Sequence, residues 1–111
     1  MAFKKSTKPT FVNRVKVLMP NSKGGHDVNQ FDGIFKLVAN DKEMEKLREM
    51  TPKDSIREVL TGWNEFQEED GTPVPFNEAE VEALLSIPQA LHGLLLAFFE
   101  NVVKAPEKNS R

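Results

Sequence analysis

The side chains best suited to acid–base chemistry or metal binding are scarce in this chain, which has two histidines and no cysteine. His26 follows a pair of glycines, and His92 lies among leucines. Neither is part of an H-E-x-x-H motif, and without cysteine a zinc site would need distant carboxylates. A catalytic triad needs a histidine aligned by an acid, and neither histidine has the context of a nucleophile elbow. We therefore expect no enzyme activity, no catalytic residue, no metal and no cofactor.

Two short motifs have the composition of ion-binding loops but not the spacing. The acidic run from Glu65 to Gly71 lacks the alternating ligands and terminal glutamate of an EF-hand. Gly24-Gly25 is not followed by the Lys-Ser/Thr pair of a phosphate-binding loop. The sequence predicts a solvated loop or a small hairpin at the first position and a turn at the second.

The charge is unevenly distributed along the chain. The formal net charge is −2, but residues 1–40 carry seven Lys or Arg against two Asp, while residues 41–111 carry eight against fifteen acids. Lys4, Lys5 and Lys8 have no interleaved aromatic residues for base stacking. We expect no nucleic-acid partner, whereas opposite charge in the two halves favours contacts between copies.

Length and composition predict a single soluble domain. The chain has 111 residues, of which 39% are hydrophobic and 29% charged, the range of an ordinary globular domain. No apolar run approaches the roughly 20 residues that span a bilayer, and no signal peptide is evident, so we expect no membrane contact and a cytoplasmic location. The expected organisation is a flexible arm at 1–9, one domain at 10–104 and a disordered tail at 105–111.

The first half of the domain has the pattern of a β-hairpin. From Thr10 to Met19 apolar and basic side chains alternate, and a Pro-Asn-Ser-Lys-Gly-Gly segment then breaks the strand. A second strand is expected from Val28 to Val38, with Gly33 at a β-bulge.

After Asn40 the apolar spacing changes to that of helices. Asn40 is expected to cap a short helix over 41–50, and Thr51 with Pro52 begins a second one. Ile56, Val59, Leu60 and Trp63 follow the i, i+3, i+4, i+7 rule. This spacing predicts that the second helix continues to Trp63 and that Trp63 is a packing residue.

A third helix is expected to start after Asn77. Asn77 and Glu80 have the spacing of a capping box, and Phe76 with Val81 that of a hydrophobic staple. Pro88 ends this helix or begins the next at its first turn.

The last expected helix, 89–104, carries more large apolar side chains than one buried stripe can hold. If Leu91, Leu95, Phe98 and Val102 face the core, then Leu96, Phe99 and Val103 point elsewhere and need a cover. These three are the candidate protein-binding residues. The alternative is that the whole helix lies in the middle of the fold as a core helix. The complete pattern predicts an α+β fold, an N-terminal β-hairpin followed by a small bundle of three to four α-helices.

One part of the chain resembles a known family. The segments Leu60-Thr61-Gly62-Trp63, Glu69 to Asn77, Leu84-Leu85-Ser86-Ile87-Pro88 and Ala97-Phe98-Phe99-Glu100 resemble the tail assembly chaperones of long-tailed, siphophage-type bacteriophages. The likeness covers most of residues 10–104, and its middle part is the specific one. The chain departs from the family pattern in having Asn64-Glu65-Phe66 after the tryptophan, where a small residue or glycine is expected.

The resemblance implies a non-enzymatic chaperone that keeps the tape-measure protein soluble during tail assembly, acts in the host cytoplasm and is absent from the mature virion. It also implies a longer frameshifted product in some members. Self-association is a further expectation. The alternatives are a structural tail or connector subunit and a small regulator that binds nucleic acid.

Overall fold

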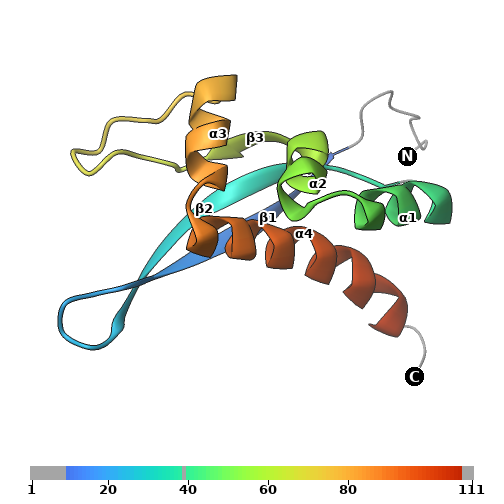
Figure 1. The fold of residues 1–111 in the computed structure, drawn as a ribbon, viewed down its shortest axis with the longest axis horizontal. Helices are drawn as coiled ribbons and strands as arrows, with labels where there is room; N and C mark the ends of the chain where they lie inside the picture. Colours follow the sequence, from blue (N-terminus) through green and yellow to red (C-terminus); the bar gives the residue numbers. More distant parts are fainter. Residues whose placement is uncertain (1–9, 39, 109–111) are drawn as a thin grey trace, which may run out of the picture.

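The computed structural model describes residues 10–38 and 40–108, with side chains through Glu100, and it has the expected α+β class. The elements are β1 (Thr10–Pro20), β2 (His26–Lys36), α1 (Asp41–Glu49), α2 (Pro52–Val59), β3 (Leu60–Asn64), α3 (Glu78–Leu85) and α4 (Pro88–Lys108) (Figure 1). Helix α4 continues four residues past the expected end at Lys104. The expected arm at 1–9 and residues 109–111 of the expected tail lie outside the described residues.

The predicted hairpin is confirmed and forms part of a three-stranded antiparallel sheet with the order β1-β2-β3. Val15 pairs with Phe31, and Phe11 with Phe35, on the face that the helices cover. The turn is held by Asn21, whose side-chain oxygen accepts hydrogen bonds from the backbone N–H groups of Lys23 and Gly25, each at 3.0 Å. This side-chain oxygen takes the place of a backbone acceptor, as is common for asparagine in turns.

The third strand corrects the prediction of a helix running to Trp63. Helix α2 ends at Val59, Leu60 is already extended (ψ 118°), and Leu60–Asn64 pairs with β2. Thr61 and Gly62 are poor helix formers, and pairing satisfies the free backbone groups of β2. Tertiary pairing therefore overrides an apolar spacing that fits a helix equally well.

The bulge lies in β3 and not at Gly33. Ile34 pairs with Gly62 and Phe35 with Leu60, so Thr61 is the extra residue, and its hydroxyl donates to the carbonyl of Ile34 at 3.1 Å. Gly33 has a different role. A Cβ at Gly33 would lie 2.9 Å from the Phe35 ring and 3.0 Å from a Val15 methyl group, so the glycine makes room for core side chains.

Asparagine and threonine side chains cap three helices as predicted. The backbone N–H groups of Glu43, Asp54 and Glu80 donate to Asn40, Thr51 and Asn77 at 3.0, 3.2 and 2.9 Å. Each bond satisfies one of the N–H groups that a helix start leaves without a partner.

An ion pair joins two of these helices. Arg57 of α2 donates two hydrogen bonds to Glu82 of α3, at 2.5 and 2.7 Å, and a third to Asp54. The Arg57 guanidinium holds the pKa of Glu82 below its ordinary value, although desolvation opposes the shift. The bidentate geometry fixes the orientation of α3 relative to α2.

Helix α4 crosses β1 at very short range. A Cβ at Gly93 would collide with the backbone carbonyl oxygen of Lys16, so only glycine permits this approach. Asn13 of β1 donates from its side-chain amide to the carbonyl of Ala97 at 2.9 Å. The buried face of α4 consists of Ala90, Gly93, Leu94, Ala97 and Phe98.

This face differs from the predicted stripe. Leu91 and Leu95 are only partly buried and flank it. Small residues define the face because they let the helix backbone lie against the strand.

The described part contains no single helix that is long and apolar enough to cross a membrane. Helices α3 and α4 meet that criterion only as a pair, by length and composition, and they are bent by 101° at their junction.

Replacing Gly93 with alanine should destabilise the protein by about 1–3 kcal/mol, because the added methyl group forces α4 and β1 apart. In an exposed helix the same change stabilises by up to about 1 kcal/mol, so the sign is diagnostic. Gly25→Ala is the matched control, since its Cβ would meet only the Asn21 side chain, at 3.8 Å or more. Urea unfolding gives both values, and a stabilised Gly93→Ala protein would contradict the close crossing.

Replacing Asn77 with alanine should cost about 1 kcal/mol, the ordinary value of a helix cap. The donor to Asn77 is the backbone N–H of Glu80, so Glu80→Gln should leave the free energy of unfolding nearly unchanged. Thermal unfolding of the two variants measures this difference. Equal losses would mean that the Glu80 side chain contributes to the cap as much as Asn77 does.

Candidate protein-binding surface

The side chains suited to acid–base chemistry or metal binding form no cluster in the part of the chain that the structure describes. His26 begins β2 and His92 lies on α4, and both are exposed. Among the described residues, no group of three or more histidine and acidic side chains is arranged to hold a metal ion.

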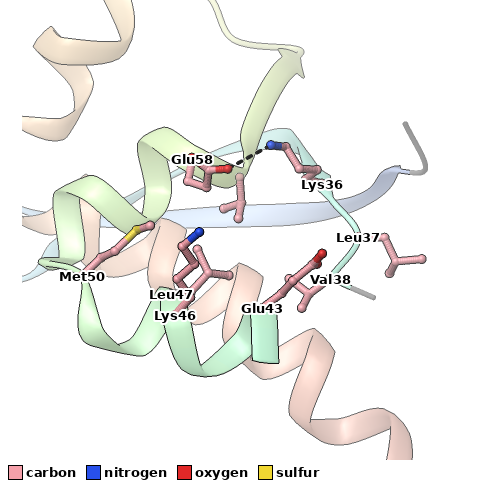
Figure 2. A pocket seen from close by; sticks show the side chains of 9 residues that line it. Lys36, Leu37, Val38, Glu43, Lys46, Leu47, Met50 and Glu58 are labelled. Atoms are coloured by element: carbon pink, nitrogen blue, oxygen red, sulfur yellow. Dashed lines mark hydrogen bonds and ion pairs between the residues drawn. The ribbon is translucent and has the colours of Figure 1, made fainter. Parts of the chain in front are cut away.

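A hollow of about 240 Å³ lies between the end of β2 and helices α1 and α2 (Figure 2). Its lining includes the apolar side chains of Leu47 and Met50. At its edge Lys36 forms an ion pair with Glu58 at an N–O distance of 3.2 Å, and both side chains are about half exposed. An exposed pair of this kind contributes little stability and offers no activated nucleophile or base.

The acidic segment after β3 forms a short two-stranded turn, as its polar composition predicts. Gln67 and Pro73 are bridged, and the N–H of Glu68 donates to the carbonyl of Thr72 at 2.8 Å. Asp70 accepts hydrogen bonds from the Thr72 side chain and backbone, which lowers the pKa of its carboxyl group. The Asp70 carboxylate thus stabilises the turn.

Glu65 opens this segment in the left-handed conformation, with φ 62°. A side chain costs roughly 1 kcal/mol in that region, where glycine is favoured. The position is where the resemblance leads one to expect a small residue or glycine. The Glu65 carboxylate forms an ion pair with Arg14 of β1 at 3.0 Å, which ties the strained residue to the sheet.

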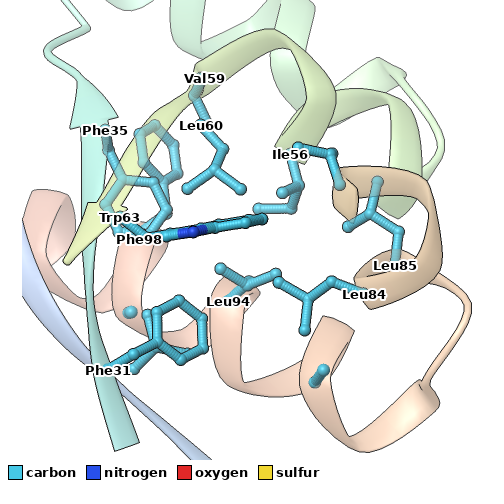
Figure 3. Close-up of a cluster of buried hydrophobic side chains, with 14 of the residues drawn as sticks. Phe31, Phe35, Ile56, Val59, Leu60, Trp63, Leu84, Leu85, Leu94 and Phe98 are labelled. Carbon is cyan, nitrogen blue, oxygen red and sulfur yellow. The ribbon is translucent and has the colours of Figure 1, made fainter. Parts of the chain in front are cut away.

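Trp63 lies in the middle of the core, 8% exposed, with its ring between the sheet and helices α3 and α4 (Figure 3). Its indole N–H donates to the carbonyl of Val74 at 2.9 Å, so its one polar atom is satisfied. Its ring contacts Phe31, Phe66 and Phe76 at centroid distances of 6.2, 4.7 and 4.8 Å. Trp63 is therefore a packing residue, as predicted, although it belongs to strand β3 and not to a helix.

The other residues predicted as structural lie at the two ends of α3. Phe76 precedes the Asn77 cap, packs on the Trp63 ring and is 40% exposed. Pro88 is the first residue of α4, three positions after α3 ends at Leu85. Pro88 was predicted either to end the third helix or to begin the last one, and in the structure it begins the last helix.

The three candidate binding residues of the last helix differ in their surroundings. Leu96 is 52% exposed and lines a hollow of about 310 Å³ between α4 and β1, beside Arg14 and Lys16. Phe99 is partly buried instead, packed edge-on against Phe98 at 4.9 Å beside α1 and α2, so the chain itself covers much of its ring. The side chain of Val103 lies outside the described residues.

The outer face of the hairpin is a further apolar surface, which was not predicted from the sequence. Val12, Leu18 and Val28 are at least half exposed there. The sequence does contain a signal for this surface. Val12 and Leu18 are an even number of residues from the basic Arg14 and Lys16, so they lie on the same face of the strand. Apolar residues at solvent-facing strand positions indicate a contact surface.

No family model, no curated protein and no solved structure matches this chain.

Replacing Trp63 with alanine should destabilise the protein by about 3–5 kcal/mol, because a large buried ring is lost and the carbonyl of Val74 loses its donor. Trp63→Phe is the control, since it keeps an aromatic ring and removes the indole N–H, and it should cost less. Guanidinium unfolding followed by circular dichroism measures both. A Trp63→Ala protein as stable as the parent would contradict the central position of this ring.

Proposed function

We propose that this protein is a non-enzymatic tail assembly chaperone of a long-tailed bacteriophage, which binds the tape-measure protein and keeps it soluble in the host cytoplasm. It binds its client through exposed apolar side chains and leaves before the virion is mature. The last helix, with Leu96 at its centre, is the proposed client surface.

The main observation in support of a binding function is the number of large apolar side chains that the fold leaves exposed. Seven of them are exposed on the described surface: Val12, Leu18, Val28, Leu37, Phe76, Ile87 and Leu96. A domain of this size gains stability from every apolar side chain that it buries, so this exposure favours contact with a partner. The resemblance of the segment from Leu60 to Glu100 to tail assembly chaperones supports the choice of partner.

Leu96 is the best placed of the candidate residues for an apolar client helix. It is half exposed on a helix, and Phe99, about one turn further along the same helix, is partly exposed. The border of the hollow beside Leu96 has mixed charge, since Lys16 and Glu100 both line it and Arg14 is ion-paired with Asp32 and Glu65. A client helix with a leucine or phenylalanine fits this arrangement.

Replacing Leu96 with glutamate should weaken client binding by at least about tenfold, or about 1.4 kcal/mol, because a charge then faces an apolar partner. The measurement is the amount of tape-measure protein in the soluble fraction when the two proteins are co-expressed. Leu18→Glu is the matched control, since Leu18 is 53% exposed but lies on the outer face of the sheet. Both variants should melt within a few degrees of the parent protein.

The possible outcomes test the chaperone function and the location of the client surface separately. A parent protein that leaves the tape-measure protein insoluble contradicts the chaperone function. If Leu18→Glu and not Leu96→Glu lowers the soluble amount, the client surface is the sheet. Finding this protein in purified virions would favour a structural tail or connector subunit.

A further inference from the structure

A groove separate from the Leu96 surface lies where the hairpin, the acidic segment after β3 and the α3–α4 junction meet. Its volume is about 520 Å³. Met19 of β1, Phe66 of the acidic segment and Ile87 of the junction contribute apolar surface to it, and Ile87 is 38% exposed. A groove of this size accommodates a few side chains of a bound peptide.

One wall of this groove is acidic. Glu65, Glu68 and Glu69 line it together with Phe66 and Gln67. Glu65 is paired with Arg14, whereas Glu68 and Glu69 form no ion pair within residues 10–38 and 40–100. The groove thus combines an apolar floor with two carboxylates that form no ion pair with any described side chain, which fits a segment with a large apolar side chain next to lysines.

We propose that the groove binds residues 1–9 of a second copy of this chain. This segment, Met-Ala-Phe-Lys-Lys-Ser-Thr-Lys-Pro, has one aromatic side chain, three lysines and no acid. Phe3 is the apolar anchor, and Lys4 and Lys5 face Glu68 and Glu69. The proposal shares no residue with the Leu96 surface, so either can fail without the other.

We assign the segment to a second copy because it is too short to reach the groove of its own chain. Phe3 is seven residue-to-residue steps from Thr10, and these span at most about 25 Å when fully extended. Phe31, the lining residue nearest to Thr10 along the hairpin, pairs with Val15, which lies five residues along β1 and about 17 Å from Thr10. A turn that reverses the chain next to Thr10 takes up three of the seven steps, so the remaining four reach at most about 14 Å. A segment that must also reverse direction after Thr10 is too short to bring Phe3 into the groove of its own chain.

The positions of the two features agree with this length argument. In Figure 1 the start of β1 and the hairpin turn lie on opposite sides of the molecule, with α3 and the acidic segment on the side of the turn. Two copies that exchange their segments make the same contact twice, which closes a symmetric dimer. Because the contact includes exposed charges, added salt weakens it.

The first experiment measures self-association of the full chain by sedimentation over a range of concentrations. Removing residues 2–9, the double change Lys4→Glu with Lys5→Glu, and the double change Glu68→Lys with Glu69→Lys should each raise the dissociation constant at least tenfold. Combining the two charge reversals in one chain should restore it to within about threefold of the parent. Lys42→Glu with Lys46→Glu on α1 is the matched control, since it makes the same change in net charge at exposed positions away from the groove.

The second experiment uses the synthetic peptide of residues 1–9 and the chain that lacks residues 2–9. Trp63 is the only tryptophan, and its ring lies 4.7 Å from Phe66, so its fluorescence reports on the groove. The peptide should change this fluorescence in a saturable manner, and the Phe3→Ala peptide should bind at least tenfold more weakly. This measurement does not depend on whether the Glu68/Glu69 variant folds.

Several results would overturn the proposal. A parent chain that is monomeric at every concentration excludes a second copy, even if the peptide binds. An unchanged dissociation constant after removal of residues 2–9, or a combined charge reversal that restores nothing, excludes the segment as the occupant. A peptide that binds with equal strength after Phe3→Ala removes the aromatic anchor.

Discussion

The contact between Gly93 and the backbone of Lys16 is the constraint on which the rest of the fold depends. It allows α4 to lie against β1 without an intervening layer of side chains, and Asn13 then reaches the carbonyl of Ala97. With the helix this close, Leu94 and Phe98 enter the core from one side while β2 supplies Phe35 from the other. Leu96, which follows on the same helix, is turned out beside β1 by the same geometry. The core and the proposed client surface are thus two consequences of one close crossing.

Trp63 connects the parts of the molecule that the crossing does not reach. It joins β3 to the segment before α3 through the hydrogen bond to Val74, and to the acidic segment through Phe66. Phe66 also stacks on Phe31 of β2, at a centroid distance of 4.8 Å. The acidic segment is therefore fixed to the core by its aromatic residue while its carboxylates remain in solvent, so the acidic wall of the groove has a defined position.

The sequence predicted the features that local chemistry determines. Strand alternation indicated the hairpin, and the asparagine and threonine caps marked the helix starts, because both depend on residues within a few positions of one another. The third strand, Leu60–Asn64, was not predictable from its own spacing, since pairing with β2 decides its conformation. The buried face of α4 was misassigned because large side chains were taken as the guide, whereas Gly93 and Ala97 set the contact. Of the candidate site, Leu96 was placed correctly on the surface, but the partial cover of Phe99 by neighbouring helices depends on tertiary structure.

The bond between Asn13 and Ala97 joins residues that are 84 positions apart. The hairpin can form early from local contacts, but its core face, with Val15 and Phe35, has no helix against it until α4 arrives. Closing so long a loop is slow compared with hairpin formation, and folding rates fall as contacts become less local. During synthesis from the N-terminus the hairpin therefore spends most of the elongation time with an uncovered apolar face and a free edge strand. A protein proposed to shield another chain from aggregation thus passes through an aggregation-prone stage itself, which ends when its last helix docks.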